Sequence, residues 1–358
     1  MREMLLLGLD IGGANTKAAL IKVVDGTIHD SWSGVEYFPF WEQTLDNIPK
    51  MLQEIVNVLV IKNGFTLSEV NKTVISITAE LSDAFQTKEE GINAILDALI
   101  KVFEESTLRF ITHDHVFVDY REAKHDLRKL FASNWIATAL FLGKSSPNCV
   151  LVDSGSTTID LIPIINSVPS TVGKTDIVRL INHELIYTGG LRATIPSITH
   201  HVPYLTENVR ISFEKFALVA DIHRILGNIT EEDYVNDTAD GRSKSLHDCY
   251  ARLARTLCMD LSEISTRELD TIASFIYQKQ LKLIRKEINS FLEGLAHRNI
   301  FLEEDPLFVL TGSSASYLIE PILEELGYTE TKNLRDHTGI PDNVSSSAFA
   351  VAGAYRLS

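Results

Sequence analysis

Residues 5–17 read LLLGLDIGGANTK, and this segment is the strongest indication of the fold. The apolar run that ends at Asp10 predicts a buried β-strand, and a second apolar run over residues 18–24 follows the glycines. Asp25-Gly26 then indicates a hairpin turn. A strand therefore follows the glycines, whereas a P-loop or a dinucleotide fingerprint requires a helix at that point. Neither GxxxxGK[ST] nor GxGxxG is present in this turn, so both motifs are excluded.

The same order of strand, glycine turn and strand recurs over residues 149–164, which read CVLVDSGSTTIDLIPI. A lone Asp-x-Gly is usually an ordinary tight turn, but two copies favour a shared ligand. A third small-residue turn follows a late apolar strand, and it reads Thr311-Gly312-Ser313-Ser314. The three turns together predict a site for phosphate groups.

Each turn offers hydrogen-bond donors to an anion. Glycine lets the backbone approach a ligand closely, and backbone N–H groups in such turns suit phosphate oxygens. Asp10 and Asp153 end facing strands, where two carboxylates would repel each other unless they share a hydrated Mg²⁺. We therefore expect both aspartates to bind Mg²⁺ and to serve catalysis. The residues expected to bind the phosphate-bearing ligand are Gly12, Gly13, Asn15, Thr16, Lys17, Gly155, Ser156, Thr157, Thr158, Thr311, Gly312, Ser313 and Ser314.

Helical and strand-like periodicities alternate along the 358 residues and predict an α/β protein of two domains. The first domain is expected over residues 1–142, with a helix over 345–358 that returns to it. The second is expected over 143–344, and it contains the second and third turns and a helical insertion. Helices are predicted over residues 41–60, 91–103, 134–142 and 266–299, and strands over 73–78 and 116–118.

The composition excludes several classes of function. Lysine and arginine number 33 against 48 aspartates and glutamates, so the net charge is −15. This negative field repels polyanions, and we expect small-molecule substrates and neither nucleic acid nor a membrane as a partner. Cys149, Cys249 and Cys258 form no close pair and no zinc-ligand pattern, which favours a reducing cytoplasm. A homo-oligomer is compatible with this composition.

Longer motifs connect the chain to a family. They are LDIGGANTKAA at residues 9–19, TAELSDAF at 78–85, ASNW at 132–135, DSGSTTID at 153–160 and YTGGLR at 187–192. Together they resemble the hydantoinase A-like branch of the superfamily of acetate and sugar kinases, chaperone ATPases and actin. Within that branch they resemble the archaeal proteins of tetrahydromethanopterin-linked one-carbon metabolism and methanofuran biosynthesis. The resemblance covers nearly the whole chain and implies two actin-like, ribonuclease H-like domains that face a phosphate-binding cleft.

The resemblance implies a transferase and not a kinase. Such an enzyme joins (5-(aminomethyl)furan-3-yl)methyl diphosphate to the phenol of γ-glutamyltyramine, which forms an aryl ether and releases diphosphate. Mg²⁺ and the turns would neutralise the leaving group. A phenol has a pKa near 10, so a base is also needed. The candidates for that base are Glu80, Asp83 and Asp119, although Glu80 and Asp83 could equally cap a helix. Asp119 and Arg192 are expected to contact substrate.

Two residues depart from the family pattern. Ser154 stands where a larger apolar residue is expected, and Gly190 stands where leucine or valine is common. Neither change removes a donor or a carboxylate, so both bear on the choice of substrate. Two other functions stay open. One is an ATP-dependent small-molecule kinase, or an ATP-using subunit like those of hydantoinases and oxoprolinases, and the other is a non-catalytic nucleotide-binding switch.

Overall fold

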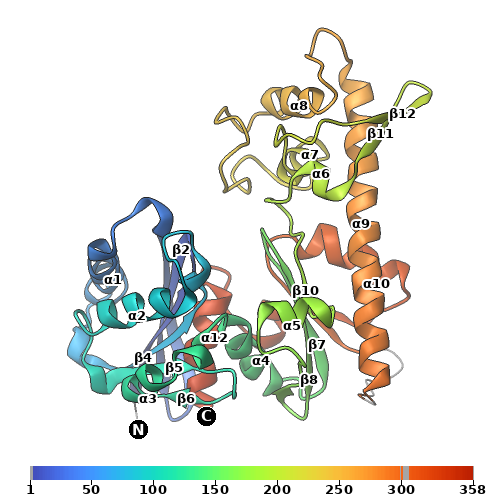
Figure 1. Ribbon diagram of the computed structural model, residues 1–358. Helices are drawn as coiled ribbons and strands as arrows, with labels where there is room; N and C mark the ends of the chain where they lie inside the picture. The colour runs from blue at the N-terminus through green and yellow to red at the C-terminus, as the bar shows by residue number, and fades with distance from the viewer. Residues whose placement is uncertain (1–2, 299, 301–305, 358) are drawn as a thin grey trace. The chain divides into compact units, whose positions relative to one another are not determined.

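The computed structural model describes residues 3–298, 300 and 306–357. The chain divides into two compact units (Figure 1). Unit 1 comprises Met1–Val150, Ile162–Val178 and Lys332–Ser358, and unit 2 comprises Leu151–Leu161 and Arg179–Thr331. Among the described helices, none combines the length and the apolar character needed to cross a membrane.

The first sheet has the strand order β3-β2-β1-β4-β5-β6. The predicted opening hairpin is confirmed, because β1 pairs antiparallel with β2. Asp25 and Gly26 between β2 and β3 both have positive φ, as a tight hairpin turn requires. β1 pairs parallel with β4, and β4 pairs parallel with β5. The strands are β1 (Glu3–Ile11), β2 (Asn15–Val24), β3 (Thr27–Tyr37), β4 (Val70–Ile77), β5 (Leu108–Ile111) and β6 (Phe117–Val118).

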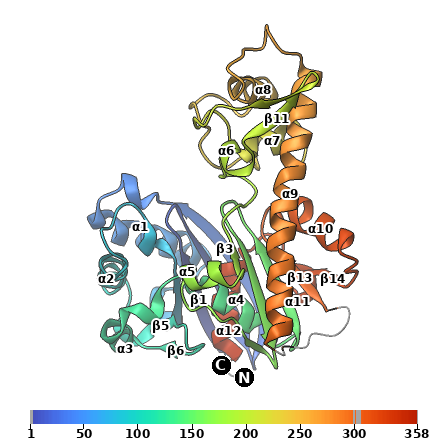
Figure 2. The ribbon, with the colours of Figure 1, turned by 45° about the vertical axis from the view of Figure 1, so that its right-hand side comes forward.

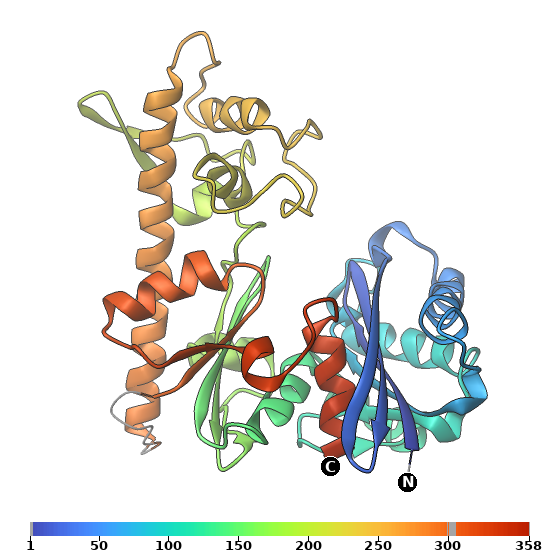
Figure 3. The ribbon, with the colours of Figure 1, turned by 180° about the vertical axis from the view of Figure 1, so that it is seen from behind.

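Both faces of β1 are covered by helices, which explains its continuous apolar sequence. Leu5, Leu7 and Leu9 belong to a core with residues of α1 (Ile48–Val56) and α2 (Lys88–Leu99). The opposite face meets α12 (Ser346–Leu357), and a Cβ at Gly8 would lie 2.2 Å from the carbonyl oxygen of Ala348. Figure 3 shows α12 against these first strands. The other helices of unit 1 are α3 (Tyr120–His125), α4 (Asn134–Gly143) and α11 (Leu334–Thr338).

The second sheet repeats the strand order of the first. Its path is β10-β8-β7-β13-β14, so its strands lie in the order third, second, first, fourth and fifth along the chain, apart from the short β9 beside β8. In the first sheet, strands β3-β2-β1-β4-β5 lie in this same order, which is the order of a ribonuclease H-like sheet. The strands are β7 (Cys149–Ser154), β8 (Ile159–Ile165), β9 (Val168–Pro169), β10 (Leu185–Ile186), β13 (Phe308–Thr311) and β14 (Thr331–Asn333), and α5 is Asp176–Ile181.

The expected helical insertion lies between β10 and β13 in unit 2. It has its own apolar core and is built on α9, a 32-residue helix that begins after the capping residue Ser265 (Figure 2). Inside it, the guanidinium of fully buried Arg252 contacts Asp221 at 2.8 Å and Asp240 at 3.1 Å. The elements are α6 (Ile195–Ile198), β11 (His201–Tyr204), β12 (Glu207–Arg210), α7 (Val219–Ile225), α8 (Leu246–Arg255) and α9 (Thr266–His297), and α10 (Glu320–Glu325) follows β13.

Several element boundaries differ from the predicted ones. The helix expected over residues 41–60 begins only at Ile48, because Pro49 occupies its first turn and two short 3-10 turns precede it. The predicted strands do not include β5, β9, β10, β11, β12 or β14. The 3-10 helices are η1 (Phe40–Glu42), η2 (Leu45–Asn47), η4 (Leu67–Glu69), η5 (Ala79–Leu81), η6 (Glu105–Thr107) and η7 (Leu127–Leu130), and the π-helices are η3 (Asn57–Ile61) and η8 (Ala315–Ile319).

Candidate functional site

The first glycine turn, residues 12–14, joins β1 to β2 in unit 1. The N–H of Gly12 donates to the carbonyl oxygen of Asn15 at 3.1 Å, which closes the turn. Phe40 and Phe38 donate to the carbonyl oxygens of Gly13 and Ala14, respectively. Among the described residues, no acceptor is found for the N–H groups of Gly13 and Ala14. The turn therefore presents two free amides, which are suitable donors to a phosphate oxygen.

Asp10 is at the carboxyl end of β1 and is 4% exposed. Ser76 on neighbouring β4 donates a hydrogen bond to its Oδ1 at a long 3.3 Å. Lys17 is opposite Asp10 in the strand register and is exposed, as is Asn15. The hydroxyl of fully buried Thr16 has no hydrogen-bond partner among the described residues. Ser76 is the one side-chain donor to Asp10 among the described residues. Because a buried carboxylate with one weak neutral donor is poorly compensated, Asp10 suits a bound cation.

The second glycine turn has the same internal hydrogen bond as the first. In unit 2, the N–H of Gly155 donates to the carbonyl oxygen of Thr158 at 2.9 Å. The N–H groups of Ser156 and Thr157 find no acceptor among the described residues, and both residues are half-buried. The hydroxyl oxygens of Ser156 and Thr157 are 3.5 Å apart, so oxygen donors and amides occupy the same turn.

Residues 189–192, from which only Arg192 was predicted to be a site residue, form the support of this second turn. The N–H of Gly189 donates to Thr157, that of Gly190 to Gly155, and those of Leu191 and Arg192 to Ser156, at 2.9–3.1 Å. A Cβ at Gly189 would lie 2.5 Å from the carbonyl oxygen of Gly155, so only glycine fits. The carbonyl oxygens of the turn, which would repel an anion, are therefore bonded to residues 189–192. The pair Gly189-Gly190 was the available signal for this role.

The late turn, residues 311–314, meets the second turn in unit 2. The N–H of Ser314 donates to the carbonyl oxygen of Ser154 at 3.0 Å, and Ser314 Oγ lies 3.0 Å from the carbonyl oxygen of Gly155. A Cβ at Gly312, whose φ is +91°, would lie 2.2 Å from the Ser154 oxygen and 2.7 Å from Asp153 Oδ1. Thr311, Gly312 and Ser313 remain at least partly exposed, whereas Ser314 is fully buried.

The two departures from the family pattern have one structural cause. Ser154 Oγ hydrogen-bonds Ser314 Oγ at 2.7 Å, so the buried hydroxyl that replaces an apolar side chain is satisfied. A Cβ at Gly190 would lie 2.5 Å from Ser314 Cβ and 2.3 Å from the Tyr317 hydroxyl oxygen. The small residue at position 190 thus leaves room for Ser314 and Tyr317. The departures adjust the packing beneath the second turn.

Glu80 is the carboxylate with the most unusual environment in unit 1. It is 2% exposed, and its Oε1 accepts a hydrogen bond from the N–H of Ala132 at 2.9 Å. Its Oε2 is buried and has no partner among the described residues. Burial raises the pKa of Glu80 to about 7. A carboxyl of that pKa can take or give a proton near neutral pH.

The other predicted site residues have different surroundings. Asp83 is exposed on the segment after η5. Asp119 caps α3, because its side chain accepts the N–H of Glu122 while the side chain of Glu122 accepts the N–H of Asp119. The side chain of Arg192 is exposed and makes no ion pair with a described residue, which leaves the guanidinium available to an anion.

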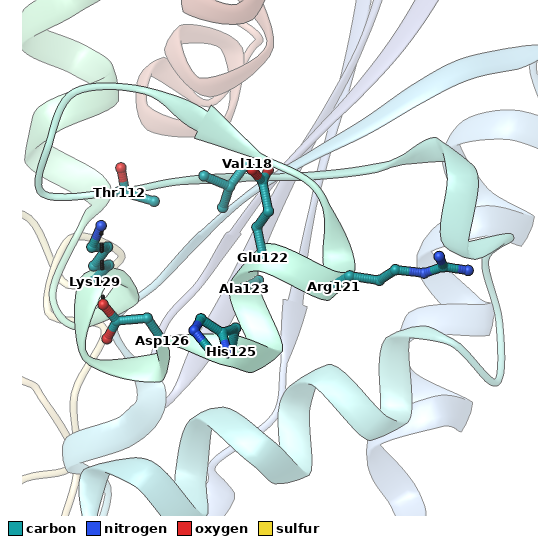
Figure 4. A pocket seen from close by; sticks show the side chains of 8 residues that line it. All are labelled: Thr112, Val118, Arg121, Glu122, Ala123, His125, Asp126 and Lys129. Atoms are coloured by element: carbon teal, nitrogen blue, oxygen red, sulfur yellow. Dashed lines mark ion pairs between the residues drawn. The ribbon is translucent and has the colours of Figure 1, made fainter.

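Two cavities lie in unit 1 away from the glycine turns. The larger, of about 610 Å³, is lined by Thr112, by residues of β6 and α3, and by Asp126 and Lys129 (Figure 4). Its charged side chains include Asp126 and Lys129, whose charged atoms are 4.0 Å apart. The smaller, of about 230 Å³, is lined by His113, Asp114, His115, Trp135, Thr171 and Lys174. Neither cavity contains a residue predicted for the site.

The donor set suits magnesium better than a transition metal. Among the described residues, no group of three or more His, Cys, Asp and Glu side chains is placed to bind a metal. Mg²⁺ needs only one or two carboxylates because it keeps several waters and binds substrate phosphates. Asp10, poorly compensated by protein donors, fits such an ion. The cysteines offer little, since burial raises the pKa of both Cys149 and Cys249 to about 12.

Comparison with known proteins places the chain in a family. The family model described as hydantoinase/oxoprolinase matches residues 71–353. The chain belongs to the hydantoinase/oxoprolinase family. The chain is 37% identical to a protein of Methanocaldococcus jannaschii over 351 residues, which cover 98% of the chain and 97% of that protein. The name of that protein is (4-{4-[2-(γ-L-glutamylamino)ethyl]phenoxymethyl}furan-2-yl)methanamine synthase.

A second relative agrees with this family assignment, and a solved structure agrees with the fold. A Methanococcus vannielii protein of the same name is 32% identical to this chain over 208 residues. These residues cover 57% of this chain and 89% of that protein. A nucleotide-free structure of acetone carboxylase is 11% identical in sequence to this chain, with a TM-score of 0.54. The aligned region covers 98% of this chain and 70% of the acetone carboxylase chain. At this identity the likeness shows the fold alone, and it agrees with the predicted actin-like α/β class.

Proposed function

We propose that this chain is a transferase of methanofuran biosynthesis. It joins (5-(aminomethyl)furan-3-yl)methyl diphosphate to the phenolic oxygen of γ-glutamyltyramine and releases diphosphate. The observation that carries the proposal is the 37% identity, over nearly the full length of both chains, to the Methanocaldococcus jannaschii synthase. The name of that synthase describes an aryl ether between a tyramine-derived ring and a furanylmethyl group.

The glycine turns support the release of diphosphate. The free amides of Ser156 and Thr157, with the exposed guanidinium of Arg192, offer donors to an oxyanion in unit 2. The free amides of Gly13 and Ala14 offer donors to an oxyanion in unit 1. Asp10 and Asp153 are the carboxylates proposed to hold Mg²⁺. When bound, Mg²⁺ would neutralise the charge that develops on the departing diphosphate.

The reaction requires one proton transfer. The bond between the furanylmethyl carbon and the diphosphate oxygen breaks with its electron pair on diphosphate, and a bond to the phenolic oxygen replaces it. The phenolic proton must leave as this bond forms, because a phenol has a pKa near 10. Of the three candidate bases, we propose Glu80, since its pKa is about 7 and its Oε2 has no described hydrogen-bond partner.

Mass spectrometry of the purified protein with Mg²⁺ and both substrates tests the function. The coupled ether together with diphosphate is the expected result, and a parallel incubation with Mg²⁺, γ-glutamyltyramine and ATP is the control. ADP without ether would replace the proposal by an ATP-using enzyme. If neither product formed, nucleotide-dependent assembly measured by light scattering would test the switch alternative.

The pH profile of the reaction tests Glu80. For wild type, kcat/KM should rise with pH up to about 7, where the Glu80 carboxyl becomes a carboxylate. Glu80→Gln should lower kcat/KM and remove that rise. Asp83→Asn is the matched control, because Asp83 is exposed three residues away. A Glu80→Gln variant that kept the wild-type profile would exclude Glu80 as the base.

A further inference from the structure

A buried chain of polar groups connects the helical insertion to the second glycine turn, entirely within unit 2. Gln280, in the middle of α9, is 1% exposed. Its Nε2 donates to Thr188 Oγ1 at 3.2 Å and to the carbonyl oxygen of Gly189 at 3.0 Å. Its Oε1 lies 3.0 Å from Nε2 of His223 on α7. Gln280 therefore satisfies the polar groups of two elements that are far apart in the sequence.

The hydrogen bonds determine which nitrogen of His223 carries the proton. The side-chain Nδ2 of Asn228, which can only donate, lies 3.1 Å from His223 Nδ1, so Nδ1 is the acceptor. Nε2 then carries the proton and donates to Gln280 Oε1. Burial lowers the pKa of His223 to about 4, so the ring is neutral at physiological pH. The neutral ring holds the Gln280 amide with both of its N–H groups free for Thr188 and Gly189.

Thr188 and Gly189 begin the segment that supports the second turn. The carbonyl oxygens of residues 155–157 accept four hydrogen bonds from the N–H groups of residues 189–192. A shift of Gly189 would loosen these bonds, since its own N–H donates one of them, to the carbonyl oxygen of Thr157 at 2.9 Å. The amides of Ser156 and Thr157 depend on this support for their direction.

The same face of α9 also contacts η8, the helix that follows the late turn. Tyr277 precedes Gln280 by three residues, so both side chains lie on one side of the helix. Its hydroxyl donates to the carbonyl oxygen of Tyr317 at 2.5 Å, three residues after Ser314. The ring of His223 packs on both tyrosines, with centroid distances of 5.6 Å to Tyr277 and 4.6 Å to Tyr317. These contacts and those of Gln280 therefore connect α7 and α9 to η8 and to the segment that supports the second turn.

We propose that Gln280 is a positioning residue for anion binding at the second glycine turn. Held by His223, its amide fixes Thr188 and Gly189, and through them it aims the free amides of Ser156 and Thr157 at the ligand. The insertion is thus a support for the anion site. The inference rests on the proposed function only in naming diphosphate as that anion.

Calorimetric titration of the full chain with inorganic diphosphate in the presence of Mg²⁺ tests the inference. Gln280→Glu keeps the size of the side chain but places oxygens where Thr188 and Gly189 need donors, so the Kd should rise at least about tenfold. Gln278→Glu makes the same change at an exposed position of the same helix and should leave the Kd unchanged. The unfolding midpoint of each variant reports whether the fold persists.

A second variant covers the case in which Gln280→Glu does not fold. Gln280→Met removes the donors without placing a charge in the core, and it should also raise the Kd. Tight diphosphate binding by a folded Gln280→Met or Gln280→Glu variant would overturn the inference, as would no binding by wild type. Wild type that binds diphosphate yet forms no ether would contradict the proposed function alone, and the comparison of Kd values would still decide the role of Gln280.

Discussion

Gly12 and Gly155 make the same hydrogen bond in two separate turns. Each lies two residues after an aspartate, and each donates its N–H to the carbonyl oxygen three residues ahead, at 3.1 Å and 2.9 Å. The next two amides in each turn have no acceptor among the described residues. The repeated Asp-x-Gly of the sequence is therefore a repeated local structure that presents amides to a ligand.

Replacing either aspartate should impair the reaction while the protein stays folded. Asp10→Asn and Asp153→Asn each remove a carboxylate proposed for Mg²⁺, so turnover should fall at least about 100-fold and its dependence on Mg²⁺ should weaken. Steady-state rates over a range of Mg²⁺ concentrations measure both effects. Asp25→Asn, in the exposed hairpin turn after β2, is the control. Normal turnover by both variants would refute the assignment of the metal.

The free energy of unfolding should depend on pH because of Glu80. Its pKa is about 7 in the folded protein against 4.5 for an ordinary glutamate, so the folded state binds the proton more tightly. The free energy of unfolding should fall by about 3 kcal/mol in total as the pH rises from 4.5 to 7, and it should stay constant at higher pH. Glu80→Gln should abolish this slope in urea titrations at pH 5 and pH 7.5. An unchanged slope would mean that another group titrates.

The late turn should tolerate only glycine at position 312. Gly312→Ala places a methyl group 2.2 Å from the carbonyl oxygen of Ser154 at a φ of +91°, so unfolding should become easier by roughly 2–4 kcal/mol. Gly294→Ala is the matched control in α9, where a Cβ meets no atom within 4 Å. That change should stabilise the protein by up to about 1 kcal/mol. Thermal unfolding compares the two, and equal effects would contradict the close packing.

Asp119 should prove to be a helix cap. Asp119→Ala removes the acceptor for the N–H of Glu122 and should cost about 1 kcal/mol of stability. Asp119→Asn keeps the cap and should cost less. Neither variant should change kcat by more than about twofold. A large loss of kcat in a stable Asp119→Asn variant would instead support the role in substrate binding that the sequence suggested.

Arg252 should be essential to the insertion. Its removal in Arg252→Met leaves the fully buried carboxylate of Asp221 without its cation, which should cost roughly 3–5 kcal/mol. Arg242→Met is the control, because Arg242 is exposed and 3.7 Å from Asp240, and it should cost less than about 1 kcal/mol. Chemical denaturation measures both. A small effect of Arg252→Met would show that Asp221 is stabilised in another way.

The sequence by its local patterns indicated the two strand–turn–strand hairpins and the positions of the glycine turns. Apolar runs that stop at Asp10 and Asp153, each followed by Asp-x-Gly, are local signals, because strand burial and turn conformation depend on neighbouring residues. They predicted β1, β2, β7 and β8 correctly. Resemblance to a family added the function class, which no local pattern contains.

The support of the second turn depends on contacts between residues that are far apart in the sequence. Gly189, Gln280 and His223 are separated from the turn by about 30 to 120 positions, and their hydrogen bonds form only when the chain brings them together. The raised pKa of Glu80 is likewise a consequence of burial by distant residues. Hydrogen bonds and desolvation act over a few ångströms in space, whereas sequence patterns report on neighbours along the chain, so these features could not be read from the sequence.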